Sequence, residues 1–253
     1  NAISVGASTG QTLHLSGGIS GSGQFNKTGS GVLRIGDSSD FTGTLQAAGG
    51  RVVVDGVMNS ASKVVVGSGA VVGGSGTVGA LEIASGGKVG PGNSPGQLNV
   101  AGKATWGGGA RYEWEINNFL GSAGTNWDFL NIGGLLEITA TSNSKFLIEV
   151  VSLLAGNSRG SAQGFDAFSN YSFDIATAAG GIQGFDAAAF ELDVSGFANP
   201  TWPTGAASGG AWSVLQSGNS IRLNYAAAIP EPNSASLVLL GLGIAYWRRR
   251  RNR

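Results

Sequence analysis

Residues 63–100 read KVVVGSGAVVGGSGTVGALEIASGGKVGPGNSPGQLNV, and this stretch decides the fold class. Short runs rich in β-branched and aliphatic residues alternate in it with glycine and serine, at Lys63–Val66, Ala70–Val72, Ala80–Ile83 and Gln97–Val100. Runs of this length suit β-strands and are too short for helices. The stretch therefore predicts an all-β chain in which strands and tight turns follow one another.

The same pattern extends toward the N-terminus, with further runs at Val32–Ile35 and Arg51–Val54. Residues 1–110 contain 28 of the 45 glycines of the 253-residue chain. The runs recur at loose intervals, which favours stacked coils over hairpins with fixed turns, because each coil supplies the core of its neighbour. We expect a parallel β-helix, or β-solenoid. An antiparallel sandwich built from the same strands remains the alternative.

A family resemblance supports the solenoid. Gly73–Val78 followed by Gly86–Gly96, together with Lys27–Leu33 and Phe41–Leu45, resembles the autotransporter-associated β-strand repeat family. The resemblance covers roughly residues 20–110, and a possible extension runs to Gly133. It implies a right-handed parallel β-helix in a secreted surface protein, without catalytic residues. The chain lacks the alternating strands of a C-terminal barrel at its end, so that family's secretion route is not carried over.

Beyond residue 110 glycine becomes sparser, and all six tryptophans lie at or after position 106. Polar and apolar residues alternate at Arg111–Ile116, Asn170–Ile175 and Ser220–Tyr225, which is the period of a half-buried strand. We expect a more irregular β-rich continuation or capping region. The tryptophans, Trp202 and Trp212 included, are expected to fill the core rather than to stack on sugar rings. The predicted organisation is residues 1–110 as solenoid repeats, 111–228 as this continuation and 229–253 as a separate terminal segment.

One pentapeptide occurs twice, as Gln163–Ala167 and again as Gln183–Ala187. The interval of twenty residues suggests one further coil. The aspartates Asp166 and Asp186 are interpreted as turn residues, because aspartate side chains hydrogen-bond the backbone in tight turns. Calcium binding is the alternative, but two carboxylates fall short of the oxygen ligands that calcium prefers. In the same way the prolines and glycines of Pro91–Gly96 predict a defined corner between coils.

The last residues combine three signals in one order: Ile229–Pro232, an apolar run and an arginine cluster. The apolar stretch of residues 235–247 would span about 20 Å as a helix, which is short of a bilayer core. Arginines on the cytoplasmic side and an aromatic pair at the interface nevertheless favour one short transmembrane helix. The membrane segment is predicted to contain Leu237, Val238, Leu239, Leu240, Leu242, Ile244, Tyr246 and Trp247. The cytoplasmic basic tail comprises Arg248, Arg249, Arg250, Arg251 and Arg253.

This trio resembles the PEP-CTERM sorting signal. The resemblance implies that Pro230, Glu231 and Pro232 are recognised by an exosortase, a membrane enzyme that processes the protein near the motif. Two prolines keep the backbone extended, and we expect them to hold the motif outside both helix and sheet. A plain linker before a permanent anchor is the alternative. An export signal is expected upstream of Asn1.

Composition narrows the function classes. The chain has no cysteine and one histidine, His14, which leaves no thiol nucleophile and no histidine metal cluster. Residues 1–229 have ten basic and fourteen acidic residues, a net charge of −4 that argues against a nucleic-acid partner. No cofactor or metal is predicted, and no enzymatic activity.

We therefore expect an exported structural or adhesive protein of the cell envelope, cell surface or extracellular matrix. Its expected partners are an exosortase-like enzyme, the inner membrane before processing, and exopolysaccharide or other surface components. The alternative is a polysaccharide-binding or polysaccharide-cleaving β-helix. A groove with aspartate clustered beside arginine or lysine would favour cleavage, whereas plain ladders of side chains would favour a scaffold.

Overall fold

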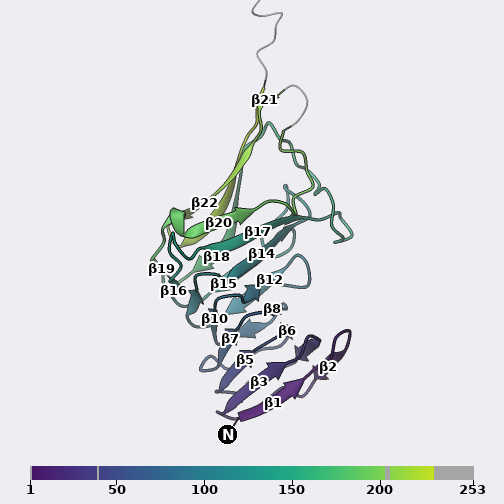
Figure 1. Ribbon diagram of the computed structural model, residues 1–253, viewed down its shortest axis with the longest axis vertical. Helices are drawn as coiled ribbons and strands as arrows, with labels where there is room; N and C mark the ends of the chain where they lie inside the picture. The colour runs from purple at the N-terminus through teal and green to yellow at the C-terminus, as the bar shows by residue number, and fades with distance from the viewer. Residues whose placement is uncertain (1, 39, 203–205, 231–253) are drawn as a thin grey trace, which may run out of the picture.

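The computed structural model describes residues 2–38, 40–202 and 206–230. Nearly all regular elements in these ranges are β-strands, and they form an elongated body with the N-terminus at one end (Figure 1). The one helical element of the described residues is a single 3-10 turn, η1, at Ala187–Ala189. The all-β prediction is confirmed.

Three large sheets form the faces of the body. The first contains β1 (Ala2–Gly6), β3 (Gln24–Thr28), β5 (Thr44–Ala47), β7 (Lys63–Val66), β10 (Ala80–Ile83), β13 (Ala104–Trp106), β16 (Leu136–Ile138) and β19 (Ile182–Gln183). The second contains β2 (Thr12–Leu15), β4 (Val32–Ile35), β6 (Gly50–Val54), β8 (Ala70–Gly73), β11 (Lys88–Val89), β14 (Arg111–Ile116), β17 (Phe146–Ser152) and β20 (Phe190–Asp193). The third contains β9 (Thr77–Val78), β12 (Gln97–Val100), β15 (Phe129–Ile132), β18 (Tyr171–Ala178), β23 (Ser220–Ala226) and β22 (Ala211–Ser217).

From β1 to β20 consecutive strands lie in different sheets, and strands pair with those of the adjacent coils. Thus β10, β11 and β12 pair in parallel with β7, β8 and β9. This arrangement is that of a parallel β-solenoid and excludes the antiparallel sandwich. The right-handed winding that the repeat family implies stays a prediction.

The late coils are longer than the early ones. Gln24 pairs with Thr44 and Thr44 with Lys63, so an early coil takes 20 or 19 residues. Leu136 pairs with Ile182, so a late coil takes 46 residues. The additional residues form loops outside the sheets. The change in coil length begins near the point where glycine becomes sparse in the sequence.

Inward-facing side chains form ladders from coil to coil. In the first sheet Leu45, Val64, Leu81, Ala104 and Leu136 are successive register partners, and all are buried. Alternate residues point outward and pair across coils, as Lys63 does with Glu82 at 2.6 Å. The result is one continuous core. In the late coils large aromatic rings fill it: Trp106 stacks on Phe146, with ring centroids 4.7 Å apart.

One inward position is charged. Lys27 lies in the register of Ala47 and is fully buried. Its Nζ donates to the carbonyl oxygens of Thr28, Gly29 and Gly49 at 2.9 to 3.0 Å. These three bonds satisfy the ammonium group and link two successive coils, which makes a buried lysine tolerable.

The corner predicted at Pro91–Gly96 connects β11 to β12, and a buried aspartate fixes it. The Asp128 carboxylate accepts hydrogen bonds from the backbone N–H groups of Gly96 at 2.8 Å and Glu115 at 3.2 Å. Burial and the nearby Glu115 raise the pKa of Asp128 well above its ordinary value, although the two N–H donors act in the opposite direction. Asp128 therefore joins the corner to the adjacent coil.

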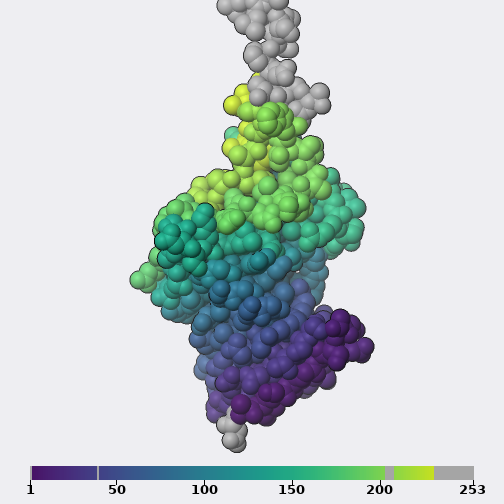
Figure 2. Space-filling model, in the orientation of Figure 1, coloured from purple at the N-terminus to yellow at the C-terminus, as the bar shows by residue number. Residues whose placement is uncertain are grey.

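An antiparallel extension closes the C-terminal end of the third sheet. Strand β23 pairs antiparallel with both β18 and β22. The body narrows beyond these strands to the end at which β21 (Ala206–Ser208) and β24 (Ile229–Pro230) lie (Figures 1 and 2). The described residues after position 110 are also β-rich, and the division of the chain at that position stays a prediction.

Replacing Leu81 by alanine should lower the free energy of unfolding by about 2–5 kcal/mol, because it leaves a cavity in the inner ladder. The neighbouring outward Glu82→Ala should cost about 0–1 kcal/mol, since it removes only a surface ion pair. Urea unfolding followed by circular dichroism measures both. Equal losses would mean that Leu81 does not lie inside the stack.

The raised pKa of Asp128 predicts a pH dependence. A carboxyl that binds its proton more tightly in the folded state adds stability below its unfolded pKa of about 3.9, and this contribution disappears as pH rises through the folded pKa. Asp128→Asn should lack that component when thermal unfolding is measured from pH 4 upward. An identical pH profile in the two proteins would contradict the assignment.

Candidate functional site

The terminal segment leaves the body at its narrow end. The backbone N–H of Ala228 donates to the Ala167 carbonyl at 2.7 Å, and the N–H of Ala227 donates to Asn170 Oδ1 at 2.7 Å. Both partners lie in the loop between β17 and β18, which belongs to the last full coil. The chain is therefore tied to the solenoid up to the residue before Ile229.

The next two residues form β24, which pairs antiparallel with β21 through Ile229 with Ser208 and Pro230 with Ala206. The expectation that both motif prolines stay outside a sheet is therefore wrong for Pro230. Proline is acceptable in this position because it ends a two-residue edge strand, where no central ladder requires its missing N–H. Pro230 is nevertheless exposed.

The other residues predicted to carry the sorting function lie outside the described residues. They are Glu231, Pro232, the whole membrane segment within residues 237–247 and the arginines of residues 248–253. Among the residues that the structure describes, no helix combines the length and the apolar character needed to cross a bilayer.

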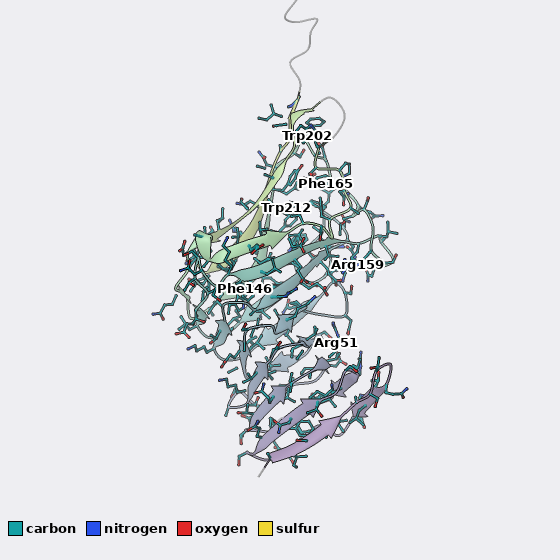
Figure 3. All side chains as sticks on the ribbon, viewed as in Figure 1. Arg51, Phe146, Arg159, Phe165, Trp202 and Trp212 are labelled. Carbon is teal, nitrogen blue, oxygen red and sulfur yellow. The ribbon has the colours of Figure 1, made fainter. Side chains whose placement is uncertain are left out.

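Three apolar side chains are exposed around the exit, and we call them the apolar tip: Phe168, Trp202 and Ile229. Their exposed fractions are 40%, 68% and 61%. Phe168 follows Ala167, whose carbonyl oxygen accepts the hydrogen bond from Ala228. The Trp202 ring lies beside Gly209, because a Cβ atom added at Gly209 would be 3.3 Å from it. Figure 3 shows Trp202 at the narrow end, beyond Phe165 and Trp212. The prediction that Trp202 fills the core is thus wrong, whereas Trp212 packs against the hydrophobic core.

A cluster of aromatic rings supports the exit from within. Tyr225 of β23 contacts Phe165 and Trp212, with ring centroids 5.1 and 5.3 Å apart. Its hydroxyl donates to the carbonyl oxygen of Ala167 at 3.3 Å, and that of Thr201 lies 3.5 Å away. Burial, followed by the nearby Tyr171 and Asp166, raises the pKa of Tyr225. Tyr225 therefore connects the three segments that form the tip.

The repeated pentapeptide does not mark one further coil. Gln183 lies in β19, in register with Glu137, whereas Gln163 lies in a loop and forms a bridge with Asn118. The late coil is longer than the twenty-residue interval, so the two copies occupy different corners. Their aspartates do act as turn residues: Asp166 accepts from the N–H of Phe168 at 3.0 Å, and Asp186 from that of Ala188 at 2.9 Å.

A shallow pocket of about 260 Å³ lies on the outer face of the second sheet. Its charged lining consists of Lys88, Glu113, Glu149, Arg159 and Asp193. It thus contains an acidic group beside lysine and arginine, the combination that would favour cleavage of polysaccharide. Lys88 contacts both glutamates, at 3.1 Å to Glu113 and 2.7 Å to Glu149.

The protonation of these groups decides what the pocket can do. Burial lowers the pKa of Lys88, but hydrogen bonds and charges of Glu149 and Glu113 outweigh burial and raise it. At neutral pH the Lys88 side chain is therefore protonated and paired with the two glutamates, so it cannot act as a base. Hydrogen bonds from Ser195 lower the pKa of Asp193, which stays ionised. The arrangement is typical of an ion-pair network across coils. In the ranges that the structure describes, no three or more histidine, cysteine, aspartate or glutamate side chains are placed so that they could hold a metal ion together.

Comparison with known families identifies the terminal segment. The PEP-CTERM protein-sorting motif matches residues 228–251, starting at the alanine tied to the last coil. This motif implies processing by an exosortase-like enzyme and export to the cell envelope or surface. No curated protein matches the chain.

The packing of the tip can be tested at Gly210. An added methyl group there would lie 2.0 Å from the Tyr225 hydroxyl oxygen, so Gly210→Ala should lower the free energy of unfolding by about 1–3 kcal/mol. Gly156→Ala is the matched control, because an added methyl group there meets nothing within 4 Å. Thermal unfolding compares the two variants. A stable Gly210→Ala protein would show that Tyr225 does not occupy the assigned place.

Proposed function

We propose that this protein is an exported, non-enzymatic component of the bacterial cell surface or extracellular matrix, sorted through its C-terminal segment. An exosortase-like enzyme recognises Pro230, Glu231 and Pro232 while residues 237–247 occupy the inner membrane and the arginines lie on its cytoplasmic side. The observation that carries this proposal is the sorting-motif match at residues 228–251, which begins where the stacked body ends.

The position of the motif supports recognition by another enzyme. Ile229 and Pro230 are exposed, and among the described residues the short strand β21 is the one that pairs with them. A two-stranded ribbon of this size is marginal in water, so it opens at little cost when an enzyme binds the extended peptide. The body behind it is held by the antiparallel pairing of β23 with β18 and β22 and by the parallel ladders of the coils, and it does not need to unfold for processing.

The body suits a structural or adhesive role. Its outer faces present short ladders of ion pairs, such as Lys63 with Glu82 and Lys103 with Glu137 at 2.7 Å. Stacked coils make an elongated surface along which a polymer such as exopolysaccharide can lie. The resemblance of residues 20–110 to autotransporter-associated repeats, with their right-handed β-helix, agrees with a durable surface module.

A polysaccharide-cleaving activity is the second candidate, since the pocket around Lys88 contains acidic and basic groups together. The protonated state of Lys88 counts against it, because a lysine that keeps its proton and is paired with Glu113 and Glu149 cannot act as a general base. Asp193 is ionised, but its lowered pKa makes it a weak base. Binding of a polysaccharide without cleavage remains compatible with the same pocket.

Processing at the motif is tested by the intact mass of the protein recovered from its native cells. The natural protein should lack the residues beyond a point near 230, whereas a variant with Pro230→Ala and Pro232→Ala should retain them. Pro200→Ala is the control, because Pro200 is exposed but lies outside the motif, and it should be processed normally.

Protease added to intact cells separates export from processing. The unprocessed double variant should still be digested from outside, because only its sorting is impaired. Full-length mass in both the natural protein and the double variant would contradict processing and leave a permanent membrane anchor.

A further inference from the structure

The apolar tip has a fixed maximum distance from the membrane segment. Six residues, 231–236, separate Pro230 from Leu237. Seven Cα–Cα steps therefore join Pro230 to Leu237, and they span at most about 25 Å whatever their conformation, since an extended chain advances about 3.3–3.6 Å per residue. If residues 237–247 occupy the bilayer, Pro230 lies within that distance of Leu237, and Ile229 is one residue further along the chain.

The side chains at the tip match the chemistry of that zone. Tryptophan concentrates at membrane interfaces, where its ring lies among the headgroups and its N–H remains in polar surroundings. Trp202 is mostly exposed, and Phe168 and Ile229 add exposed apolar surface. These three side chains come from different segments, yet the hydrogen bonds of Ala228 and the pairing of Ile229 with Ser208 hold their segments together.

The charged residues near the apolar tip decide whether anionic lipid headgroups can attract this end of the body. Residues 160–230 have five acidic residues and one basic residue, Arg222. Arg222 is paired with Asp174 at 2.6 Å. Hydrogen bonds from Phe168 and Ser169 lower the pKa of the exposed Asp166, so it stays negative beside the tip. Residues 160–202 and 206–230 therefore present no unpaired basic side chain with which to attract anionic headgroups.

From these observations we infer that the apolar tip rests in the interfacial zone of the bilayer that holds the sorting segment, through apolar contact and independently of anionic lipid. The inference rests on the proposed function, because it requires residues 237–247 to be in the membrane. In this position the narrow end of the body stands on the membrane surface, and the motif is presented beside the bilayer.

The absence of native cysteine makes the contact measurable in the full-length chain. Single variants Trp202→Cys and Ile229→Cys are labelled with an environment-sensitive fluorophore and reconstituted into phosphatidylcholine vesicles. Val57→Cys is the matched control, because Val57 is exposed but lies in an early coil. Labels at 202 and 229 should shift their emission to the blue and be quenched by headgroup-spin-labelled lipid, whereas the label at 57 should show neither effect.

Adding phosphatidylserine or raising the salt concentration should leave the quenching unchanged. Protection of the arginine tail from trypsin inside the vesicles is measured in the same samples. A protected tail with labels 202 and 229 in water would overturn the tip contact and leave the sorting function intact. An unprotected tail would overturn the membrane segment and the tip contact together. If the labels at 202 and 229 are shielded from water only when an exosortase-like enzyme is present, the apolar tip contacts that enzyme, and the lipid contact is overturned.

Discussion

The stacking of each coil on the one before it is the interaction on which the rest of the structure depends. No strand of the early coils pairs with its sequence neighbour, so the apolar residue of one coil is buried only when the next coil covers it. The ladder through Leu45, Val64 and Leu81 shows this dependence directly. Parallel backbone hydrogen bonds and this ladder act together, because a slip by one residue would turn every inward side chain outward.

Much of this arrangement could be predicted from the sequence. Short β-branched runs at 32–35, 63–66, 80–83 and 97–100 became strands because runs of that length support no other regular element. Their loose spacing indicated stacking, and the prolines and glycines of 91–96 indicated a corner. Other features depend on contacts between residues that are distant in sequence. Lys27 faces inward because three carbonyl oxygens accept hydrogen bonds from it there, and no local sequence pattern predicts such a site.

The candidate site was predicted in part. The order of motif, apolar run and arginines identified the sorting segment without any fold, and the match at residues 228–251 agrees with it. The apolar tip was not foreseen, since Trp202 lies far in sequence from the motif and only the folded chain brings its segment beside Ile229. The repeated pentapeptide misled because coil length is not constant: loops in the late coils lengthen the period beyond twenty residues. The stacking of the coils determines where the body ends, and it therefore determines which residues surround the motif. The sequence of the motif does not.

Register between coils is the most direct test of the account, and cysteine pairs can measure it in a chain without native cysteine. Glu82 and Thr105 are outward-facing register partners in adjacent coils, whereas Glu82 and Glu137 are separated by the strand between them. Adjacent strands lie about 4.8 Å apart, within reach of a disulfide, and two strand spacings are beyond it. Under mild oxidation the account predicts a crosslink between cysteines at 82 and 105 and none between 82 and 137. A crosslink at 82 and 137, or none at 82 and 105, would contradict the parallel stack from which the sorting segment is proposed to emerge.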